Sequence, residues 1–302
     1  MMARPARAEA AGPAEDEVSA GVRRVAASLS LSRRGFLTAR GFGASVGGVL
    51  RALGPDDRAC ARDDRHAVGC WCVARRAMAC EFSVYLPPTV PNAVAVGEAA
   101  LDELEPLEEL LSVYRGSSAI TYVNENAADR PVRVDDRLFR LLERCARLSE
   151  ETGGAFDAAS GALVRAWGFV HGPKRVPTES QRRAALACCG MRHVELDAHE
   201  RTVRFRVPGV ELNFGAIGKG FAIDQAIGRM REEFGVGCAL MQGGRSSLYG
   251  LGSPSADGRG WLIGIQNPYD PTRNVATVNL KDRALGTSGA CLLYTSPSPR
   301  DS

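Results

Sequence analysis

A glycine-rich segment at residues 212–224 holds the residues best suited to chemistry. Its sequence, LNFGAIGKGFAID, predicts a strand that turns through glycine-rich backbone into the start of a helix. That geometry directs backbone N–H groups and the positive end of a helix dipole at an anion, and Lys219 adds a charge. The segment is not a P-loop, because Gly220 follows the lysine, and it lacks the third glycine of G-x-G-x-x-G. By pattern alone, phosphate binding and tight helix–strand packing are equally well supported.

Further short motifs have side chains or glycines that could line the same site, although each alone is a common structural feature. They are Met78-Ala79-Cys80 at a strand start, the polar loop 111–118, the turn 152–157, the aromatic segment 167–169, and the paired glycines Gly243-Gly244. Paired glycines at the end of a strand can form an anion nest.

The order and spacing of these motifs resemble the ApbE family of FAD:protein FMN transferases. The family pattern runs M-G-T, S-x-Y-x-x-x-S, T-x-G-A-F-D, W-G-F, D-L-x-x-I-x-K-G-Y-A-x-D, G-G and T-S-G. The matching segments in this chain are 78–80, 112–118, 152–157, 167–169, 213–224, 243–244 and 287–289. The resemblance therefore extends over most of the chain after residue 75.

The resemblance implies a two-lobed, T-fold-like α+β domain that binds FAD between its lobes. With Mg²⁺, such a protein transfers the FMN half of FAD to a threonine of an acceptor redox protein and releases AMP. By position, the implied FAD contacts are Met78, Tyr114, Ala155, Phe156, Asp157, Asn213 and Lys219. Ala216 would offer its backbone carbonyl to Mg²⁺, an ion that prefers oxygen ligands.

Two departures from the family pattern bear on activity. Asn213 stands where the family has Asp, so a hydrogen-bonding group remains without its charge. The family continues beyond T-S-G with His-x-x-Asp-Pro and then an Asp and a Thr that complete the Mg²⁺ site, whereas this chain leaves the pattern at Cys291. Residues 291–302 have no hydrophobic period and alternate Ser with Pro, which fits a natural disordered tail or, as we expect, a translated cloning or sequencing adapter. We expect a C-terminally truncated transferase domain, without its base and inactive or nearly so.

The charge distribution separates a basic N-terminal segment from a slightly acidic body. The 302 residues have a net charge of +3, but residues 1–76 hold thirteen Arg and eight acidic residues, which leaves −2 for 77–302. A nucleic-acid-binding protein concentrates basic residues on its folded domain, so the charge argues against that class. We expect a disordered leader at 1–70, the transferase domain at 71–290 and a non-native tail at 291–302.

The leader contains the sequence SRRGFLT at residues 32–38, which resembles a twin-arginine export motif. We therefore expect export to the periplasm or the outer face of the cytoplasmic membrane, with membrane association only through this leader. The chain has nine cysteines, an odd number without paired zinc-site spacing, which indicates free thiols.

Helices and strands are predicted without strict alternation, which favours an α+β fold. Helices are expected at 94–111, which Pro106 should break or kink, from Asp135 to about Gly153, and at 218–234. A short helix or turn is expected after residues 161–163 and ends at 167–169. Strands are expected at 81–86, 194–196, 203–207, 211–214, 238–242, 261–266 and 275–280.

Two other functions compete with the transferase. The first is a relative that binds FAD without transferring FMN. Such a protein would retain FAD and release no AMP in the presence of Mg²⁺, whereas a transferase would release AMP. The second is a dinucleotide-dependent oxidoreductase that uses residues 215–220 as a phosphate loop, and the failed glycine spacing disfavours it.

Overall fold

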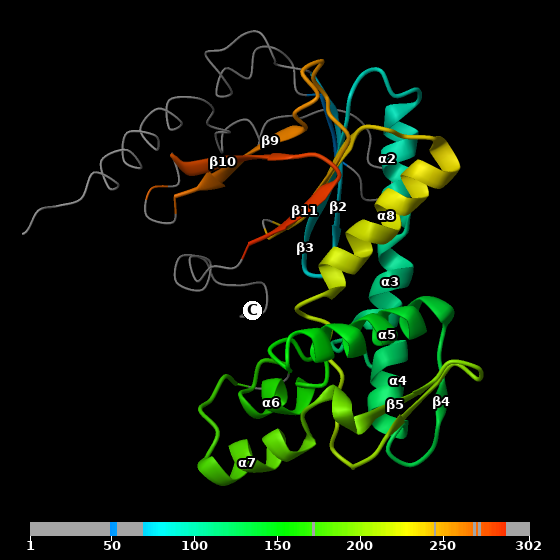
Figure 1. Ribbon diagram of the computed structural model, residues 1–302, viewed down its shortest axis with the longest axis vertical. Coiled ribbons are helices and arrows are strands. Elements are labelled where there is room, and N and C mark those ends of the chain that lie inside the picture. Colours follow the sequence, from blue (N-terminus) through cyan, green and yellow to red (C-terminus); the bar gives the residue numbers. More distant parts are fainter. Residues whose placement is uncertain are drawn as a thin grey trace, which may run out of the picture.

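The computed structural model describes residues 69–170, 173–244, 246–267, 270 and 273–287, with the backbone of 49–52. These residues form an upper and a lower lobe stacked along the long axis (Figure 1). The twin-arginine-like motif, Ser288 and Gly289 of the T-S-G motif, and the tail 291–302 lie outside the described residues.

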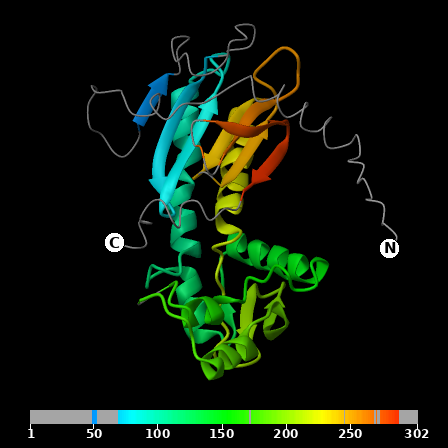
Figure 2. The same cartoon turned by 90° about the vertical axis from the view of Figure 1, so that its left-hand side faces the viewer.

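The upper lobe is built on an antiparallel six-stranded sheet in the order β1-β2-β3-β7-β8-β11. Its strands are β1 (Val49–Ala52), β2 (Trp71–Ala77), β3 (Cys80–Leu86), β7 (Ala239–Gly243), β8 (Ser247–Leu251) and β11 (Arg283–Gly286). Two helices, α2 (Ala93–Asp102) and α8 (Gly218–Phe234), cover one face of the sheet (Figure 2). Alternate β3 residues Phe82, Val84 and Leu86 are fully buried against them, as the predicted period of two requires.

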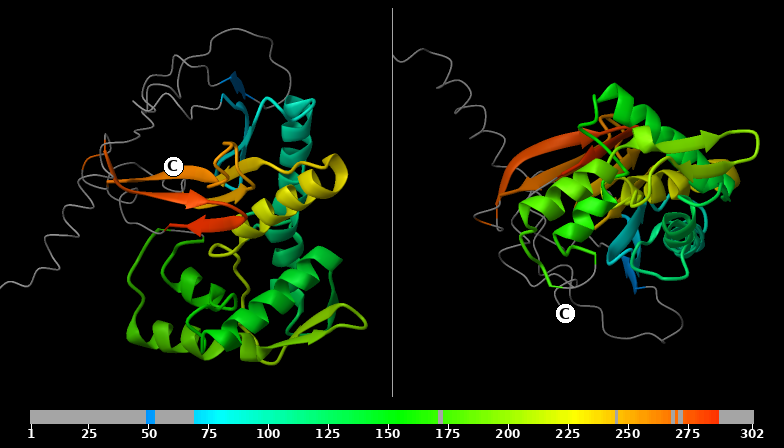
Figure 3. Two further views of the ribbon diagram at one scale, coloured as in Figure 1. Left: turned by 45° about the horizontal axis from the view of Figure 1, so that its top comes forward. Right: turned by 90° about the horizontal axis from the view of Figure 1, so that it is seen from below.

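A separate hairpin lies on the side of the sheet away from α2 and α8 (Figure 3). It consists of β9 (Trp261–Gln266) and β10 (Asn274–Leu280), which pair antiparallel. The indole N–H of Trp261 donates to the carbonyl of Leu251 in β8 at 2.9 Å, which ties the hairpin to the sheet.

The lower lobe combines four helices with a small antiparallel sheet in the order β4-β6-β5. Its elements are α4 (Ala119–Asn126), β4 (Val132–Arg133), α5 (Asp136–Glu151), α6 (Gly161–Ala166), α7 (Glu179–Cys188), a 3₁₀ turn (Met191–His193), β5 (Val194–Asp197) and β6 (Thr202–Phe205). The apolar stripe of α5 packs with β6 in one buried cluster, which makes α5 the centre of this lobe.

The helix α3 (Leu104–Leu111) joins the two lobes (Figure 2). Leu104 and Leu107 are buried in the upper core, whereas Leu111 is buried in the lower one. The chain returns upward through residues 210–217 into α8. Two connections thus fix the lobes to each other, and both pass the start of α8.

The observed helices explain two features of the sequence pattern. The predicted helix at 94–111 is divided at Glu103, and Pro106 lies in the first turn of α3, where a missing N–H costs no helical hydrogen bond. The helix α8 has the predicted bounds and ends at Gly235 with φ of 62°.

The predicted strand at 211–214 is wrong. Residues 211–214 are extended but pair with no strand among the described residues, because groups of the lower lobe satisfy their backbone instead. The strand β1 lies within the segment 1–70 that was expected to be disordered, and it pairs with the backbone of β2.

The thiol prediction is confirmed for the part of the chain that the structure describes, where none of the seven cysteines forms a disulfide. Burial raises the pKa of Cys145 in α5 to about 12, so this thiol stays protonated near neutral pH. No helix within the described ranges is long and apolar enough to cross a bilayer.

The tight turn between β2 and β3 is conformationally strained. Ala77 pairs with Cys80, so Met78 and Ala79 form a two-residue loop with φ of 49° and 59°. Two positive φ values define a type I′ turn, which normally contains Asn and Gly. The family pattern has glycine where this chain has Ala79, and a Cβ there is unfavourable.

We predict that Ala79→Gly raises the free energy of unfolding by about 1 kcal/mol, because glycine adopts the left-handed conformation without a Cβ clash. Urea unfolding measures the change. As a matched control, Ala184→Gly in the exposed middle of α7 should lower the free energy of unfolding by about 1 kcal/mol. Equal losses in both variants would show that the turn is unstrained.

Candidate functional site

The candidate site is organised by residues 211–213, which the lower lobe holds in an extended conformation. The side-chain amide of Asn124 in α4 donates to the Leu212 carbonyl at 3.0 Å and accepts from the Leu212 N–H at 2.8 Å. The Asn213 N–H donates to the Ala158 carbonyl at 2.8 Å, and the Gly161 N–H donates to the Glu211 carbonyl at 2.9 Å. The Asn124 side chain, the Ala158 carbonyl and the Gly161 N–H thus take the place of a neighbouring strand.

A Cβ at residue 161 would contact the Glu211 carbonyl oxygen at 2.6 Å, so this close approach requires Gly161. The neighbouring Arg165 Nε lies 2.9 Å from Glu211 Oε2. Burial raises the pKa of Glu211, and the Arg165 charge opposes that shift. Both α6 residues therefore help to position the segment that leads into α8.

Asn213 shapes the turn that starts α8. Its side-chain Oδ1 accepts from the Gly215 N–H at 2.8 Å, and the Phe214 carbonyl accepts from the N–H groups of Ile217 and Gly218. Because an aspartate oxygen would accept equally, the substitution from the family pattern preserves this turn. Ile217 supplies no side-chain cap, and Gly215 and Ala216 are exposed at the helix start.

Lys219 joins the start of α8 to the turn between β7 and β8. Its Nζ donates to Ser246 Oγ at 2.5 Å, and a Cβ added at Gly244 would lie 4.0 Å from that nitrogen. The same Cβ would lie 3.4 Å from Cys80 Sγ. The structure therefore brings together three predicted motifs, at 78–80, 213–224 and 243–244, around one ammonium group.

The sequence pattern does not single out Ser246, although the glycine pair Gly243-Gly244 ends two residues before it. A hydroxyl after two glycines gives no distinctive pattern. Its role depends on Gly244, whose φ of 62° lets the chain turn back toward α8.

Met78 contacts α3, and Tyr114 follows it in the sequence. The Met78 N–H donates to Glu108 Oε2 of α3 at 2.9 Å, which anchors the strained turn. Tyr114 follows α3, is 48% exposed, and its hydroxyl donates to the Phe169 carbonyl at 3.4 Å. Two segments of the predicted site, at 112–118 and 167–169, therefore meet.

The predicted FAD contacts at 155–157 lie in a loop after α5. Gly153 and Gly154 have φ of 59° and 83° and end the helix. Ala155 is exposed and Phe156 is half-buried. Asp157 Oδ1 accepts from the Ala159 N–H at 2.8 Å, and Oδ2 accepts from the Met191 N–H at 3.1 Å.

Both carboxylate oxygens of Asp157 therefore bind backbone of the lower lobe. These hydrogen bonds fix residues 157–159, and the Ala158 carbonyl in turn accepts a hydrogen bond from the Asn213 N–H. The α3 end is linked as well, because a Cβ at Gly218 would lie 3.9 Å from Leu111 Cδ1. The Asp157 loop is thus linked through backbone hydrogen bonds to Asn213 at the entry to α8, whereas the contacts of Met78 and Tyr114 are to Glu108 and Phe169.

The residues near Ala216 do not by themselves form a metal centre. Its exposed loop can offer a carbonyl oxygen, but the Asn213 oxygen is already bound to Gly215. Within the described ranges, no three His, Cys, Asp or Glu side chains converge on a common point. Magnesium normally requires carboxylates or phosphates beside a carbonyl.

This arrangement is that of a two-lobed α+β protein with an exposed helix start and one lysine at the junction. A sequence model of the ApbE family matches residues 78–296, and the chain belongs to that family. A protein named FAD:protein FMN transferase from Treponema pallidum (strain Nichols) is 32% identical over 224 residues, which are 70% of this chain and 61% of the relative.

Solved structures support the same fold. The flavin transferase ApbE from Vibrio cholerae has a TM-score of 0.65 at 22% identity, over 76% of this chain and 74% of the other. The ApbE protein from Thermotoga maritima has a TM-score of 0.65 at 25% identity, over 73% and 70%. This chain spans 61% of the length of the curated relatives from T. pallidum and Escherichia coli (strain K12).

We predict that Asn124→Ala lowers the free energy of unfolding by about 2 kcal/mol, because two hydrogen bonds to Leu212 are lost and its backbone groups lose their partners. Asn126→Ala is the matched control, since the side-chain amide of Asn126 donates to the Tyr122 carbonyl of its own helix, and it should change stability by less than about 0.5 kcal/mol. Equal effects in urea unfolding would contradict the positioning role of Asn124.

Proposed function

We propose that this chain binds FAD at the start of α8, for transfer of its FMN half to a threonine of an acceptor protein. The observation that supports this most is the Lys219–Ser246 contact, which holds an ammonium beside the exposed backbone of Gly215 and Ala216. A helix start with a fixed cation suits a pyrophosphate. The names of the relatives from T. pallidum and E. coli agree with this substrate.

The reaction requires accurate positioning more than covalent chemistry by the protein. The threonine Oγ bonds to the FMN phosphorus, the bond from that phosphorus to the bridging oxygen breaks, and AMP leaves with that oxygen. The hydroxyl proton passes to a base. Lys219 would stabilise negative charge on the pyrophosphate, while Tyr114 and Phe156 offer aromatic surface for the flavin or adenine rings.

Magnesium remains a prediction from the family resemblance. When bound, the ion would neutralise charge on the pyrophosphate. Because the described residues provide the Ala216 carbonyl without a cluster of carboxylates, they do not fit a complete magnesium site, and no step is assigned to the metal.

Export and an acceptor of the redox class are also part of this proposal. The twin-arginine-like sequence at residues 32–38 supports export, and membrane contact would then come only from the leader. If this route is used, the domain folds before it is exported, which is compatible with described cysteines that form no disulfide.

A non-catalytic FAD-binding protein is the second candidate, and it is favoured by Asn213, which stands where the family pattern has a charged Asp. Incubation of the chain with FAD, Mg²⁺ and an acceptor protein distinguishes the two. A transferase produces AMP and covalently bound flavin in equal amounts. FAD that is retained without AMP would instead support the non-catalytic protein.

We predict that Lys219→Met weakens FAD binding at least tenfold, because a charge-assisted hydrogen bond to phosphate contributes about 1.5–3 kcal/mol. Quenching of flavin fluorescence or calorimetry gives the dissociation constant. Lys281→Met, at an exposed position between β10 and β11, is the control and should leave the affinity unchanged. An unchanged affinity in Lys219→Met would make this lysine a structural residue of the helix start.

A further inference from the structure

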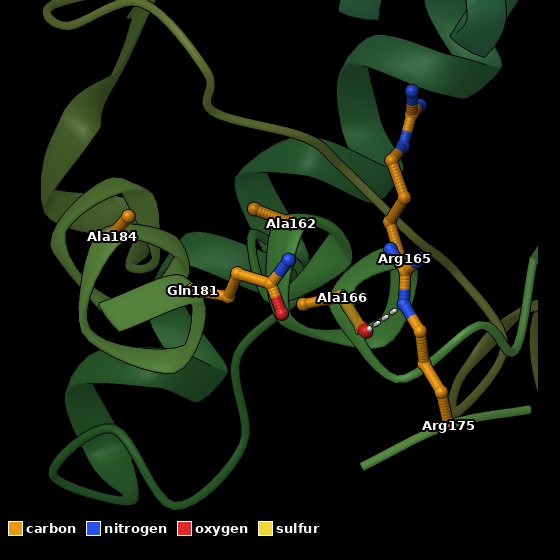
Figure 4. A pocket seen from close by; sticks show the side chains of 6 residues that line it. All are labelled: Ala162, Arg165, Ala166, Arg175, Gln181 and Ala184. Carbon is orange, nitrogen blue, oxygen red and sulfur yellow. Dashed lines mark hydrogen bonds between the residues drawn. The ribbon is translucent and has the colours of Figure 1, made fainter. Parts of the chain in front are cut away.

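A shallow groove lies between α6 and α7, on the same lobe as the Ala155–Asp157 loop (Figure 4). Its volume is about 290 Å³. Its lining residues are Ala162, Arg165, Ala166, Arg175, Gln181 and Ala184. The three alanines leave room for an apolar side chain, and Arg175 supplies positive charge at one side, where the charge of Arg165 is paired with Glu211.

The helix α7 forms one wall of the groove and packs against α6 at the surface of the protein. None of its ten residues, all of which the structure describes, is buried. Leu186 is 46% exposed, and Val176 in the preceding loop is 81% exposed. Most helices in a folded protein are stabilised by an apolar face buried on a core, whereas α7 contacts α6 and leaves Leu186 exposed.

Local hydrogen bonds hold α7 in place. Thr178 Oγ1 accepts from the Gln181 N–H, and Gln181 Oε1 accepts from the Thr178 N–H, which completes a capping box. The helix is therefore preformed with its apolar residues exposed. A preformed surface binds a partner at a lower entropic cost than one that must fold.

The charge of this region contrasts with that of the surrounding protein. Residues 160–190 contain five Lys or Arg and one acidic residue, a net charge of +4, whereas the remainder of 77–302 carries −6. The acidic residue, Glu179, is paired with Arg182 at 2.6 Å and Arg183 at 3.6 Å. A basic patch on an acidic protein attracts an acidic partner.

The groove is also connected to the candidate site. Arg165, which lines it, binds Glu211 directly before the turn into α8. The loop that follows α6 presents the Phe169 carbonyl to the hydroxyl of Tyr114. A partner in the groove would therefore contact the elements that position the start of α8.

We propose that the α6–α7 groove binds an acidic segment of the acceptor protein that also carries an apolar side chain. The three lining alanines contact the apolar side chain of this segment, and Arg175 with the basic residues near it in the sequence binds the carboxylates of the segment. The identification of the partner as the acceptor protein rests on the proposed transferase function. The prediction that the groove binds an acidic segment with an apolar side chain does not depend on that function. The groove would hold the acceptor beside the site.

The experiment measures fluorescence anisotropy of a fluorescein-labelled peptide of Glu and Leu with the complete 302-residue chain. We expect saturable binding that weakens with salt, and at least tenfold weaker binding when Ser replaces Leu or Lys replaces Glu. Arg175→Glu and Ala184→Glu should each weaken binding at least tenfold. Both positions are exposed, so the fold should be retained, and far-UV circular dichroism checks this.

Arg231→Glu, at an exposed position of α8 in the upper lobe, is the charge-matched control and should bind the peptide normally. FAD affinity should be unchanged in all three variants. Absence of peptide binding with intact FAD binding would overturn the groove proposal alone. Absence of FAD binding with intact peptide binding would overturn the proposed function alone.

Two other occupants are outcomes of the same experiment. Sedimentation velocity that shows a dimer, disrupted by Ala184→Glu, would make the groove an interface between two copies of this chain and overturn the proposal. Binding of labelled single-stranded DNA as tightly as the Glu–Leu peptide would also overturn it, because a phosphate polymer would then meet the same charge.

Discussion

The hydrogen bonds that hold residues 211–213 against the lower lobe are the constraint on which the site depends. Asn124, Ala158 and Gly161 together satisfy the backbone of this extended segment, and its direction determines where the next helix can begin. Without these bonds, a buried strand-like segment would have unpaired polar groups, which is costly inside a protein. The lower lobe therefore positions the first turn of α8, although α8 itself packs in the upper lobe.

The lower lobe therefore fixes the start of α8, and the upper lobe buries the apolar face of the helix. Lys219 lies in the first turn of α8, between the two lobes. The buried face of the helix fixes it on the sheet, while the preceding turn fixes its start. Ser246, which follows β7 in the sequence, accepts a hydrogen bond from the Lys219 ammonium through its hydroxyl. A charged group with three such supports is preorganised, which is what phosphoryl transfer demands of a protein. The α6–α7 groove belongs to the same lobe, and its Arg165 pairs with Glu211 in the segment that leads into α8.

The sequence predicted most of the elements with strong period or clear end signals. The helix α8 has an apolar stripe and Gly235, and α5 has a stripe, Asp135 as cap and Gly153 beyond its end. It did not predict β8 and β11, which are short and pair with each other across a long connection. The helix α7 was also missed, because it buries no face and its sequence shows little helical period.

The motifs around Lys219 and their order were determined by the sequence, because glycine spacing and a single lysine are local properties that survive without a fold. Their assembly was decided by the tertiary structure. Residues 211–214 have the alternation of a strand, but their partners are a side chain 88 residues earlier and a carbonyl of another loop. Ser246 gained its role in the same way. Hydrogen-bond partners distant in sequence leave no periodic signal, so only the folded chain identifies them.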